Sequence, residues 1–304
     1  MSKVSASARS DWTFDGTWPY APNYFDTGVG RMHYVDEGPR DGRPVVLVHG
    51  NPTWGYLYRS FISPLSESGY RVVVPDHLGF GRSDKPNKPS LYTIPKHSER
   101  LIALMDSLGL KDATLVAQDW GGPIGLSWPA RRPENVRSLY IMNTFAHRPP
   151  PGTKVPSILR LIRAPLVGEV LVKGRHAFVK NLLFKAIRRD RLTDTSRAAY
   201  LAPHPSYASR TGILVFPRQI PDSPTGPISD FLDEVHQGLM AFRDRPVAFA
   251  WGKRDPVFPP GVYWRLWQPD FPDAPVLWLE KAGHFLQEDA PELIVPNLLE
   301  LLER

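Results

Sequence analysis

Three residues whose side chains can do chemistry together occur far apart in the chain, each shortly after an apolar run. They are Asp119 in Q-D-W-G-G, Asp255 in W-G-K-R-D-P-V-F and His284 in K-A-G-H-F-L-Q-E. A carboxylate can act as a nucleophile, a histidine as a general base, and a second carboxylate as the group that orients the histidine. Taken singly, Asp255 before a proline is also typical of a turn, and His284 of an ordinary loop histidine. Each of the three residues follows a predicted strand, in the order nucleophile, acid, histidine, and this combination favours a catalytic set.

Asp119 lies where a predicted strand turns into a predicted helix. The stretch Thr114–Gly125 begins as an apolar run, breaks at Gly121 and Gly122, and continues with the pattern of a helix that starts at Pro123. A sharp strand-to-helix turn lifts the corner residue out of the sheet, as in the G-x-S-x-G nucleophile elbow, where that residue is a serine. Aspartate is also a preferred helix N-cap. The sequence therefore leaves two interpretations of Asp119, a nucleophile and a cap.

A carboxylate nucleophile points to one class of reaction. Attack on an acyl group would give only an anhydride, whereas attack on an sp³ carbon displaces a leaving group and gives an alkyl ester. The departing atom gains negative charge, so the site needs hydrogen-bond donors. Asn51 offers an amide N–H₂ and Trp120 an indole N–H, both suited to a large, diffuse halide. Each also has a plainer interpretation, Asn51 as a turn residue and Trp120 as a core side chain.

The second step would be hydrolysis of the ester on Asp119. His284 would take a proton from a water molecule that attacks the ester carbonyl carbon, and Asp255 would hold the imidazole and stabilise its cation. The backbone N–H groups of Asn51 and Trp120 would form the oxyanion hole. This chemistry needs neither a metal nor a cofactor.

The elements that must position these residues are short apolar strands separated by helices. Strands are predicted at Pro44–Val48, Arg71–Pro75, the run before Asp119, Val136–Met142, Pro246–Trp251 and Pro275–Leu279, and two more surround Gly28–Gly30; helices are predicted over 95–108 and 291–304. Strands that alternate with helices favour an α/β fold, with a mostly parallel sheet covered on both faces. In such sheets the working residues lie at the carboxyl ends of strands, where all the candidates above fall.

Residues 146–225 differ from the rest of the chain. They are rich in Pro and Arg and have helical patches at 157–172 and 176–190, but no convincing run of buried strands. We interpret this segment as a helical cap (lid) inserted after one strand, with residues 1–145 and 226–304 forming the core domain. Six apolar residues are candidates to line a cavity under the cap, although helical spacing alone favours core packing. They are Phe145, Leu161, Phe178, Leu182, Leu183 and Phe184.

Composition restricts the function classes. The 304-residue chain is 42% hydrophobic, which suffices for a sizeable core, and has no cysteine, which excludes disulfides, thiolate ligands and a cysteine nucleophile. No apolar run approaches a membrane span, and the N-terminus lacks the apolar segment of a secretory signal, so we expect a cytoplasmic protein. Much of the net charge of +6 lies between Lys154 and Arg191. A solvated helical face is the favoured interpretation, and a membrane-surface or subunit-contact patch the alternative.

Four segments carry a resemblance to a known family. They are H-G-N-P-T-W at His49–Trp54, Y-L-Y-R at Tyr56–Arg59, D-H-L-G-F-G-R-S-D-K-P at Asp76–Pro86 and Q-D-W-G-G at Gln118–Gly122. With these segments the chain resembles the haloalkane dehalogenases of the α/β-hydrolase superfamily. The resemblance extends from about residue 25 to the C-terminus and is weaker through the cap.

The resemblance implies an activity and a set of roles. Asn51 and Trp120 would be the halide-binding pair. Some dehalogenases carry the acid as Glu at the end of the strand before the cap; the matching position here is Asn143, so the acid falls to Asp255. The substrate would be a small apolar halogenated alkane, with water as the second reactant and a halide ion released. No nucleic acid partner and no stable membrane association are expected, and a homo-oligomer is compatible with the resemblance.

Two other functions fit parts of the pattern. An epoxide hydrolase also uses an aspartate nucleophile with an Asp–His pair, and needs cap tyrosines as the acid, for which Tyr200 and Tyr207 are candidates. A ligand receptor, or an oxygenase that needs no cofactor, would use the same scaffold. The complete set of Asp119, Asp255 and His284 argues against the receptor and the oxygenase.

Overall fold

Eight strands form one sheet in the part of the chain that the computed structural model describes, residues 12–153, 155–188 and 192–304. The strand order is β1-β2-β4-β3-β5-β6-β7-β8; β1 and β2, and β2 and β4, pair antiparallel, and the other neighbours pair parallel. The strands are β1 (Asn23–Asp26), β2 (Arg31–Glu37), β3 (Pro44–Val48), β4 (Arg71–Pro75), β5 (Ala113–Asp119), β6 (Val136–Thr144), β7 (Val247–Gly252) and β8 (Val276–Leu279). The predicted α/β fold with a mostly parallel sheet is confirmed.

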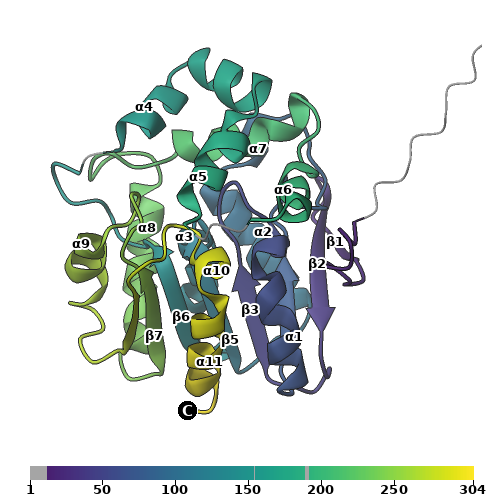
Figure 1. Cartoon of the computed structure of the whole chain (residues 1–304). Coiled ribbons are helices and arrows are strands. Elements are labelled where there is room, and N and C mark those ends of the chain that lie inside the picture. Colours follow the sequence, from purple (N-terminus) through teal and green to yellow (C-terminus); the bar gives the residue numbers. More distant parts are fainter. Residues whose placement is uncertain (1–11, 154, 189–191) are drawn as a thin grey trace, which may run out of the picture.

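Helices cover both faces of the sheet. On one face α1 packs against α11, and on the other α3 packs between α2 and α8, as Figure 1 shows. The helices outside residues 146–225 are α1 (Arg59–Glu67), α2 (Ile94–Ser107), α3 (Gly121–Arg131), α8 (Ser229–Leu239), α9 (Pro260–Val262), α10 (Leu286–Asp289) and α11 (Pro291–Leu302). This double cover explains why the central strand β5 is buried along its whole length.

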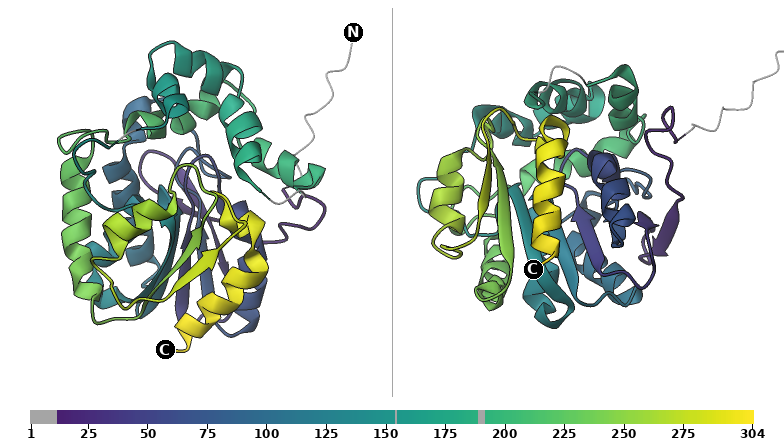
Figure 2. Two further views of the ribbon diagram at one scale, coloured as in Figure 1. Left: turned by 60° about the vertical axis from the view of Figure 1, so that its left-hand side comes forward. Right: turned by 60° about the horizontal axis from the view of Figure 1, so that its bottom comes forward.

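Between β6 and α8 the described chain forms helices that lie over one end of the sheet (Figures 1 and 2). They are α4 (Ser157–Arg163), the π-helical turns η4 (Glu169–Gly174) and η5 (Phe178–Leu183), α5 (Phe184–Ala186), α6 (Asp194–Leu201) and α7 (Thr211–Arg218). The two predicted helical patches are thus broken into shorter pieces. We keep the name cap for residues 146–225, and the division into a cap and a core remains our proposal. In the part of the chain that the structure describes, the helices lack the length and apolar character that a membrane span requires.

A shared carboxylate connects the chain just after β6 to α8. Asp270 Oδ2 accepts from Nε2 of His147, just after β6, at 2.7 Å and from Nε2 of His236, on α8, at 2.8 Å. These three side chains offer atoms within 4.8 Å of one another, the spacing of a metal-ligand group. However, the Arg243 guanidinium lies 3.8 Å from the other oxygen of Asp270, where it opposes a second cation. The cluster therefore ties the chain just after β6 to α8 and to the segment before β8.

Four of the buried histidines gather around the ring of Phe80. Burial lowers the pKa of His49, His77, His97 and His204, because a charged imidazole would be removed from water. The Phe80 ring centroid lies 5.7 to 6.4 Å from each of their ring centroids, and the centroids of His49 and His77 are 4.4 Å apart. The folded state therefore holds these rings neutral.

This arrangement predicts acid sensitivity near neutral pH. Below the ordinary histidine pKa of ~6.5, the unfolded chain binds protons that the folded chain excludes, so stability should fall as pH falls from 7.5 to 5.5. The raised pKa of His284 makes its own contribution to stability increase as pH falls, but the four histidines with lowered pKa values outweigh it. Thermal unfolding followed by circular dichroism at several pH values measures the effect.

The matched variant is His97→Phe, because Nε2 of His97 has no hydrogen-bond partner to lose. It should lower the slope of melting temperature against pH. A melting temperature that stays constant between pH 7.5 and 5.5 would contradict the interpretation.

Candidate active site

Asp119 occupies the corner between β5 and α3 in a strained backbone conformation. Its φ is +52°, in the left-handed region that non-glycine residues rarely adopt, and such strain concentrates at functional sites. The turn is tight enough that a Cβ on Gly121 would lie 2.2 Å from the carbonyl oxygen of Val48. Helix α3 therefore begins at Gly121, two residues before the predicted Pro123.

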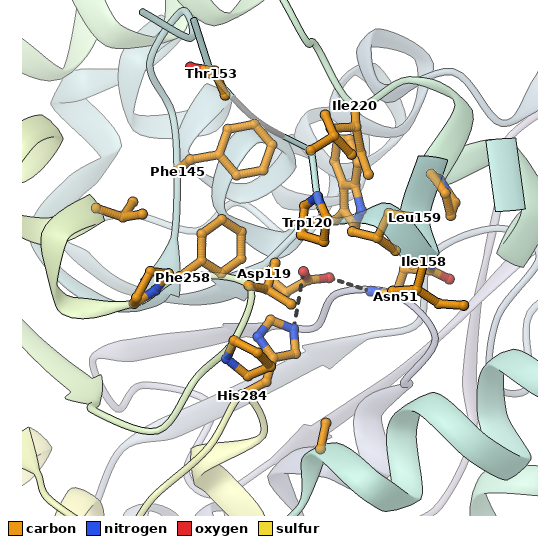
Figure 3. A pocket seen from close by; sticks show the side chains of 18 of the residues that line it. Asn51, Asp119, Trp120, Phe145, Thr153, Ile158, Leu159, Ile220, Phe258 and His284 are labelled. Carbon is orange, nitrogen blue, oxygen red and sulfur yellow. Dashed lines mark hydrogen bonds and ion pairs between the residues drawn. The ribbon is translucent and has the colours of Figure 1, made fainter. Parts of the chain in front are cut away.

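The carboxylate of Asp119 faces away from its own helix. The N-terminus of α3 has no side-chain cap, so the structure does not support the capping interpretation. Instead, Oδ1 accepts the backbone N–H of Asn51 at 2.8 Å, and Oδ2 lies 3.3 Å from Nε2 of His284, as Figure 3 shows. A Cβ on Gly50 would lie 2.3 Å from Oδ1, so that residue must be small for the carboxylate to fit.

His284 is held from its other side by Asp255. Nδ1 donates to Asp255 Oδ2 at 2.8 Å, and the same oxygen accepts the amide of Asn143 at 2.6 Å. The backbone N–H of Val257 donates to Oδ1 at 2.7 Å. Burial opposes the ionised form of Asp255, but the charge of His284 and these three donors outweigh it, so the pKa of Asp255 lies below its ordinary value.

The two carboxylates raise the pKa of His284. Burial alone would lower it, but the charge of Asp255 and the hydrogen bond to Asp119 outweigh the loss of solvation. The two carboxylates therefore favour the imidazolium form of His284, which is buried within the molecule. Removing the charge of either carboxylate would return His284 toward its neutral form.

The structure thus brings Asp119, Asp255 and His284 together, and it adds partners that sequence reasoning missed. Asn143 was predicted only as a replaced acid, yet it donates to Asp255. The side-chain amide of Gln118 donates to the backbone oxygen of His284 at 2.9 Å. The one available signal was a polar residue at the end of an apolar strand.

Asn51 and Trp120 also lie at the site. Asn51 Nδ2 donates to the backbone oxygen of Ile213 on α7 at 3.3 Å, which fixes the orientation of the amide and leaves its second N–H for a ligand. The indole of Trp120 packs edge-on against Phe145 and Phe216, with centroids at 5.4 and 5.6 Å. Among the described residues no atom accepts from its Nε1. Both side chains line the cavity in front of Asp119 (Figure 3).

This cavity has a volume of about 680 Å³ and a mostly apolar wall. Four of the six predicted lining residues contribute to it: Phe145, Phe178, Leu182 and Leu183. Leu161 and Phe184 do not line it, and Phe184 packs against the core, as helical spacing alone favoured. Leu161 is 48% exposed on the outer face of α4. Helical periodicity identifies an apolar face but does not show whether that face meets a cavity, the core or water.

Neither cap tyrosine reaches the cavity. The hydroxyl of Tyr200 donates to Glu288, which also forms a two-pronged ion pair with Arg59. Tyr207 is 51% exposed, and the Lys173 ammonium lies 4.4 Å from its ring centroid. The structure therefore does not support these tyrosines as acids for epoxide opening.

Known proteins match this chain over most of its length. The sequence profile described as alpha/beta hydrolase fold matches residues 43–291. The chain is 36% identical over 300 residues to a cis-3-alkyl-4-alkyloxetan-2-one decarboxylase of Xanthomonas campestris, covering 96% of this chain and 99% of that protein. It is 36% identical over 293 residues to a haloalkane dehalogenase of Mycolicibacterium paratuberculosis, covering 91% of each. The crystal structure of a haloalkane dehalogenase from Bradyrhizobium elkani superposes with a TM-score of 0.83 at 30% identity, covering 91% of this chain and 96% of that one.

The geometry predicts how His284 responds to the loss of one carboxylate charge. In Asp119→Asn the anion 3.3 Å from Nε2 is replaced by a neutral amide, so the pKa of His284 should fall toward the ordinary histidine range. An NMR titration of the imidazole in ¹⁵N-histidine-labelled protein measures it, with His236 as the internal control. An unchanged pKa of His284 would show that the charge of Asp119 does not stabilise the protonated imidazole.

Proposed function

The chain belongs to the α/β-hydrolase family, among members similar to haloalkane dehalogenases, and we propose that it hydrolyses carbon–halogen bonds. One observation carries the proposal. A carboxylate, and not a hydroxyl, is presented at the strand-to-helix corner, next to the base His284 and in front of an apolar cavity with two N–H donors. A serine at this corner would suit acyl transfer, whereas Asp119 suits displacement at sp³ carbon.

In the first step Asp119 attacks the carbon that bears the halogen. A carbon–oxygen bond forms as the carbon–halogen bond breaks, and the electron pair leaves with the halide. The indole N–H of Trp120 and the second amide N–H of Asn51 would donate to the departing halide. The apolar wall of the cavity excludes water, which strengthens these interactions and protects the carboxylate from solvation.

In the second step the ester itself prepares the base. Esterification removes the negative charge of Asp119, so only Asp255 still favours the imidazolium and the pKa of His284 falls. Neutral His284 then takes a proton from water, which attacks the carbonyl carbon of the ester. The backbone N–H of Asn51, which donates to Asp119 at 2.8 Å, would hold the resulting oxyanion, together with the N–H of Trp120. As the bond between the carbonyl carbon and the alkyl-bearing oxygen breaks, His284 returns the proton to the departing alkoxide. Alcohol and the Asp119 carboxylate result, and the second proton of the net reaction leaves to solvent with the halide.

We expect wild-type protein to release bromide from a terminal bromoalkane, and Asp119→Ala to lower the rate by roughly 10⁴-fold or more. His284→Phe should release one bromide per enzyme molecule and then stop, because the ester forms but is not hydrolysed. Ion chromatography measures bromide, and mass spectrometry of the intact protein measures the added alkyl group.

The isotope control distinguishes a covalent route from direct attack by water. In a single turnover in ¹⁸O-water, the first alcohol should contain unlabelled oxygen from Asp119, and the label should remain in the carboxylate. Solvent oxygen in the first-turnover alcohol would contradict the covalent mechanism.

A second candidate reaction shares the first step. In an oxetan-2-one, ring carbon C4 is sp³ and its leaving group is the ring carboxylate, so Asp119 could open the ring by attack at C4. Loss of CO₂ from C3 would then form the C3–C4 double bond and expel Asp119, with no water consumed. Two observations favour this candidate: a relative of that name matches almost the whole chain, and the cavity of about 680 Å³ exceeds the needs of a short haloalkane.

The two reactions are distinguished by offering both substrates with matched alkyl chains. A dehalogenase should release bromide from the bromoalkane, and Asn51→Ala should slow this release by about 10- to 100-fold because a halide donor is lost. A decarboxylase should give alkene and CO₂ from the cis-3,4-dialkyl oxetan-2-one, measured by gas chromatography. Alkene without bromide would replace the dehalogenase proposal by the second candidate.

A further inference from the structure

The net charge of the protein is concentrated in one part of the cap. Residues 157–188 contain seven basic residues and one acidic residue, so their net charge of +6 equals that of the whole chain. The acidic residue, Glu169, is paired with Arg218, and one of the basic residues, Arg163, is paired with Asp222. The other basic residues are Arg160, Lys173, Arg175, Lys180, Lys185 and Arg188.

The same segment exposes apolar side chains. Four of the nine exposed large apolar residues of the described chain lie in this short stretch: Ile158 (44% exposed), Leu161 (48%), Leu166 (79%) and Val170 (54%). Ile158 and Leu161 are three residues apart on α4 and so share one face of that helix. Leu166 has a φ of +64°, so its backbone is held in the left-handed region while its side chain faces water.

This surface adjoins the mouth of the catalytic cavity. Ile158, Lys185, Arg188 and Arg265 are exposed and also line the cavity, which shows where the cavity reaches the surface. Ile158 and Leu159 line the same cavity as Asn51 and Asp119 (Figure 3). An apolar molecule that met the exposed face of α4 would therefore be next to an apolar path toward Asp119.

We propose that the cap surface formed by residues 157–188 docks reversibly on an anionic lipid surface, from which apolar substrates enter the cavity. Basic residues interleaved with exposed apolar residues are the features by which peripheral segments bind the headgroup region of a bilayer. A reversible, salt-sensitive contact of this kind is compatible with the expectation of no stable membrane association. The route of the substrate rests on the proposed function, whereas the lipid contact does not.

Charge selects a lipid surface over a second copy of the chain. A symmetric contact between two such surfaces would bring together two segments of +6, which repel each other. Anionic headgroups instead complement the basic residues, and the acyl region accommodates the exposed side chains of α4 and its neighbours.

The binding test uses the full chain and vesicles of phosphatidylcholine, with or without 50% phosphatidylglycerol. We expect flotation with the anionic vesicles at 50 mM NaCl, at least ten-fold weaker binding at 500 mM, and little binding to phosphatidylcholine alone. Arg160→Glu with Lys180→Glu, and separately Leu161→Ser with Leu166→Gly, should each weaken binding at least five-fold. Glycine adopts the left-handed backbone conformation of residue 166 without strain, so Leu166→Gly should not unfold the protein. Weaker binding by this variant would therefore reflect the lost side chain.

Matched controls lie away from this surface. Lys96→Glu, on α2, and Leu293→Ser, on α11, change the same kinds of side chain and should leave binding unchanged. The proposal is overturned if anionic vesicles do not bind, if phosphatidylcholine binds equally, or if the controls weaken binding as much as the cap variants. A concentration-dependent dimer that the cap variants abolish, with no vesicle binding, would assign the surface to self-association.

The activity test separates this inference from the proposed function. Soluble 1-bromobutane should be turned over equally by wild type and the cap variants, since none of the substituted residues lines the cavity. A long-chain bromoalkane dissolved in anionic vesicles should be turned over at least five-fold more slowly by the variants. Equal rates on the vesicle-borne substrate overturn the proposed entry route. No bromide release from either substrate refutes the dehalogenase proposal, and the vesicle-binding result then tests the lipid contact by itself.

Discussion

An imidazole buried between two carboxylates is the interaction on which the site depends. Asp255 and Asp119 approach His284 from opposite ring nitrogens, at 2.8 and 3.3 Å, and together raise its pKa. Their proximity is maintained by the backbone N–H groups and by the amide of Asn143, which supply hydrogen bonds that water would otherwise provide. In the proposed reaction one of the two carboxylates is also the nucleophile, so the charge state of His284 would be coupled to the chemistry. The proposed ester would release the proton of His284 at the stage when a base is required.

The sheet supplies the rigidity that this arrangement needs. Asp119, Asn143, Asp255 and His284 come from the ends of neighbouring parallel strands or from the loops that follow them, so the backbone pairing fixes their spacing. The cap contributes in a different way. It closes an apolar cavity over Asp119, and Ile213 on α7 orients the Asn51 amide. The geometry of the candidate site is therefore set by the sheet and the loops that follow its strands, while residues 146–225 contribute much of the cavity wall.

Net charge is also distributed unevenly between the cap and the rest of the chain. Residues 157–188 account for the whole net charge, and the remaining chain is balanced. Buried charges at short distances are stabilised by their partners, and a net charge on the core would not strengthen these pairs. A net positive charge on a surface strengthens its attraction to an anionic partner. The exposed Ile158 and Leu161 belong to this part of the chain as well. The histidines that burial keeps neutral gather around the ring of Phe80 and affect stability more directly than chemistry.

The sequence by itself determined the sheet strands, the corner at Asp119 and the joint placement of Asp119, Asp255 and His284, because these follow from local patterns: short buried runs, glycines at a tight turn, and polar residues at strand ends. It did not determine the hydrogen bond of Asn143 to Asp255, the outward position of Leu161 or the hydrogen bond of Tyr200 to Glu288. Those depend on which surfaces meet across the sheet and the cap, and residues such as Tyr200 and Glu288 are 88 positions apart. Helical spacing shows that a side chain shares a face with others. Only the tertiary structure decides whether that face meets the core, a cavity or water, since burial is a property of the packed whole.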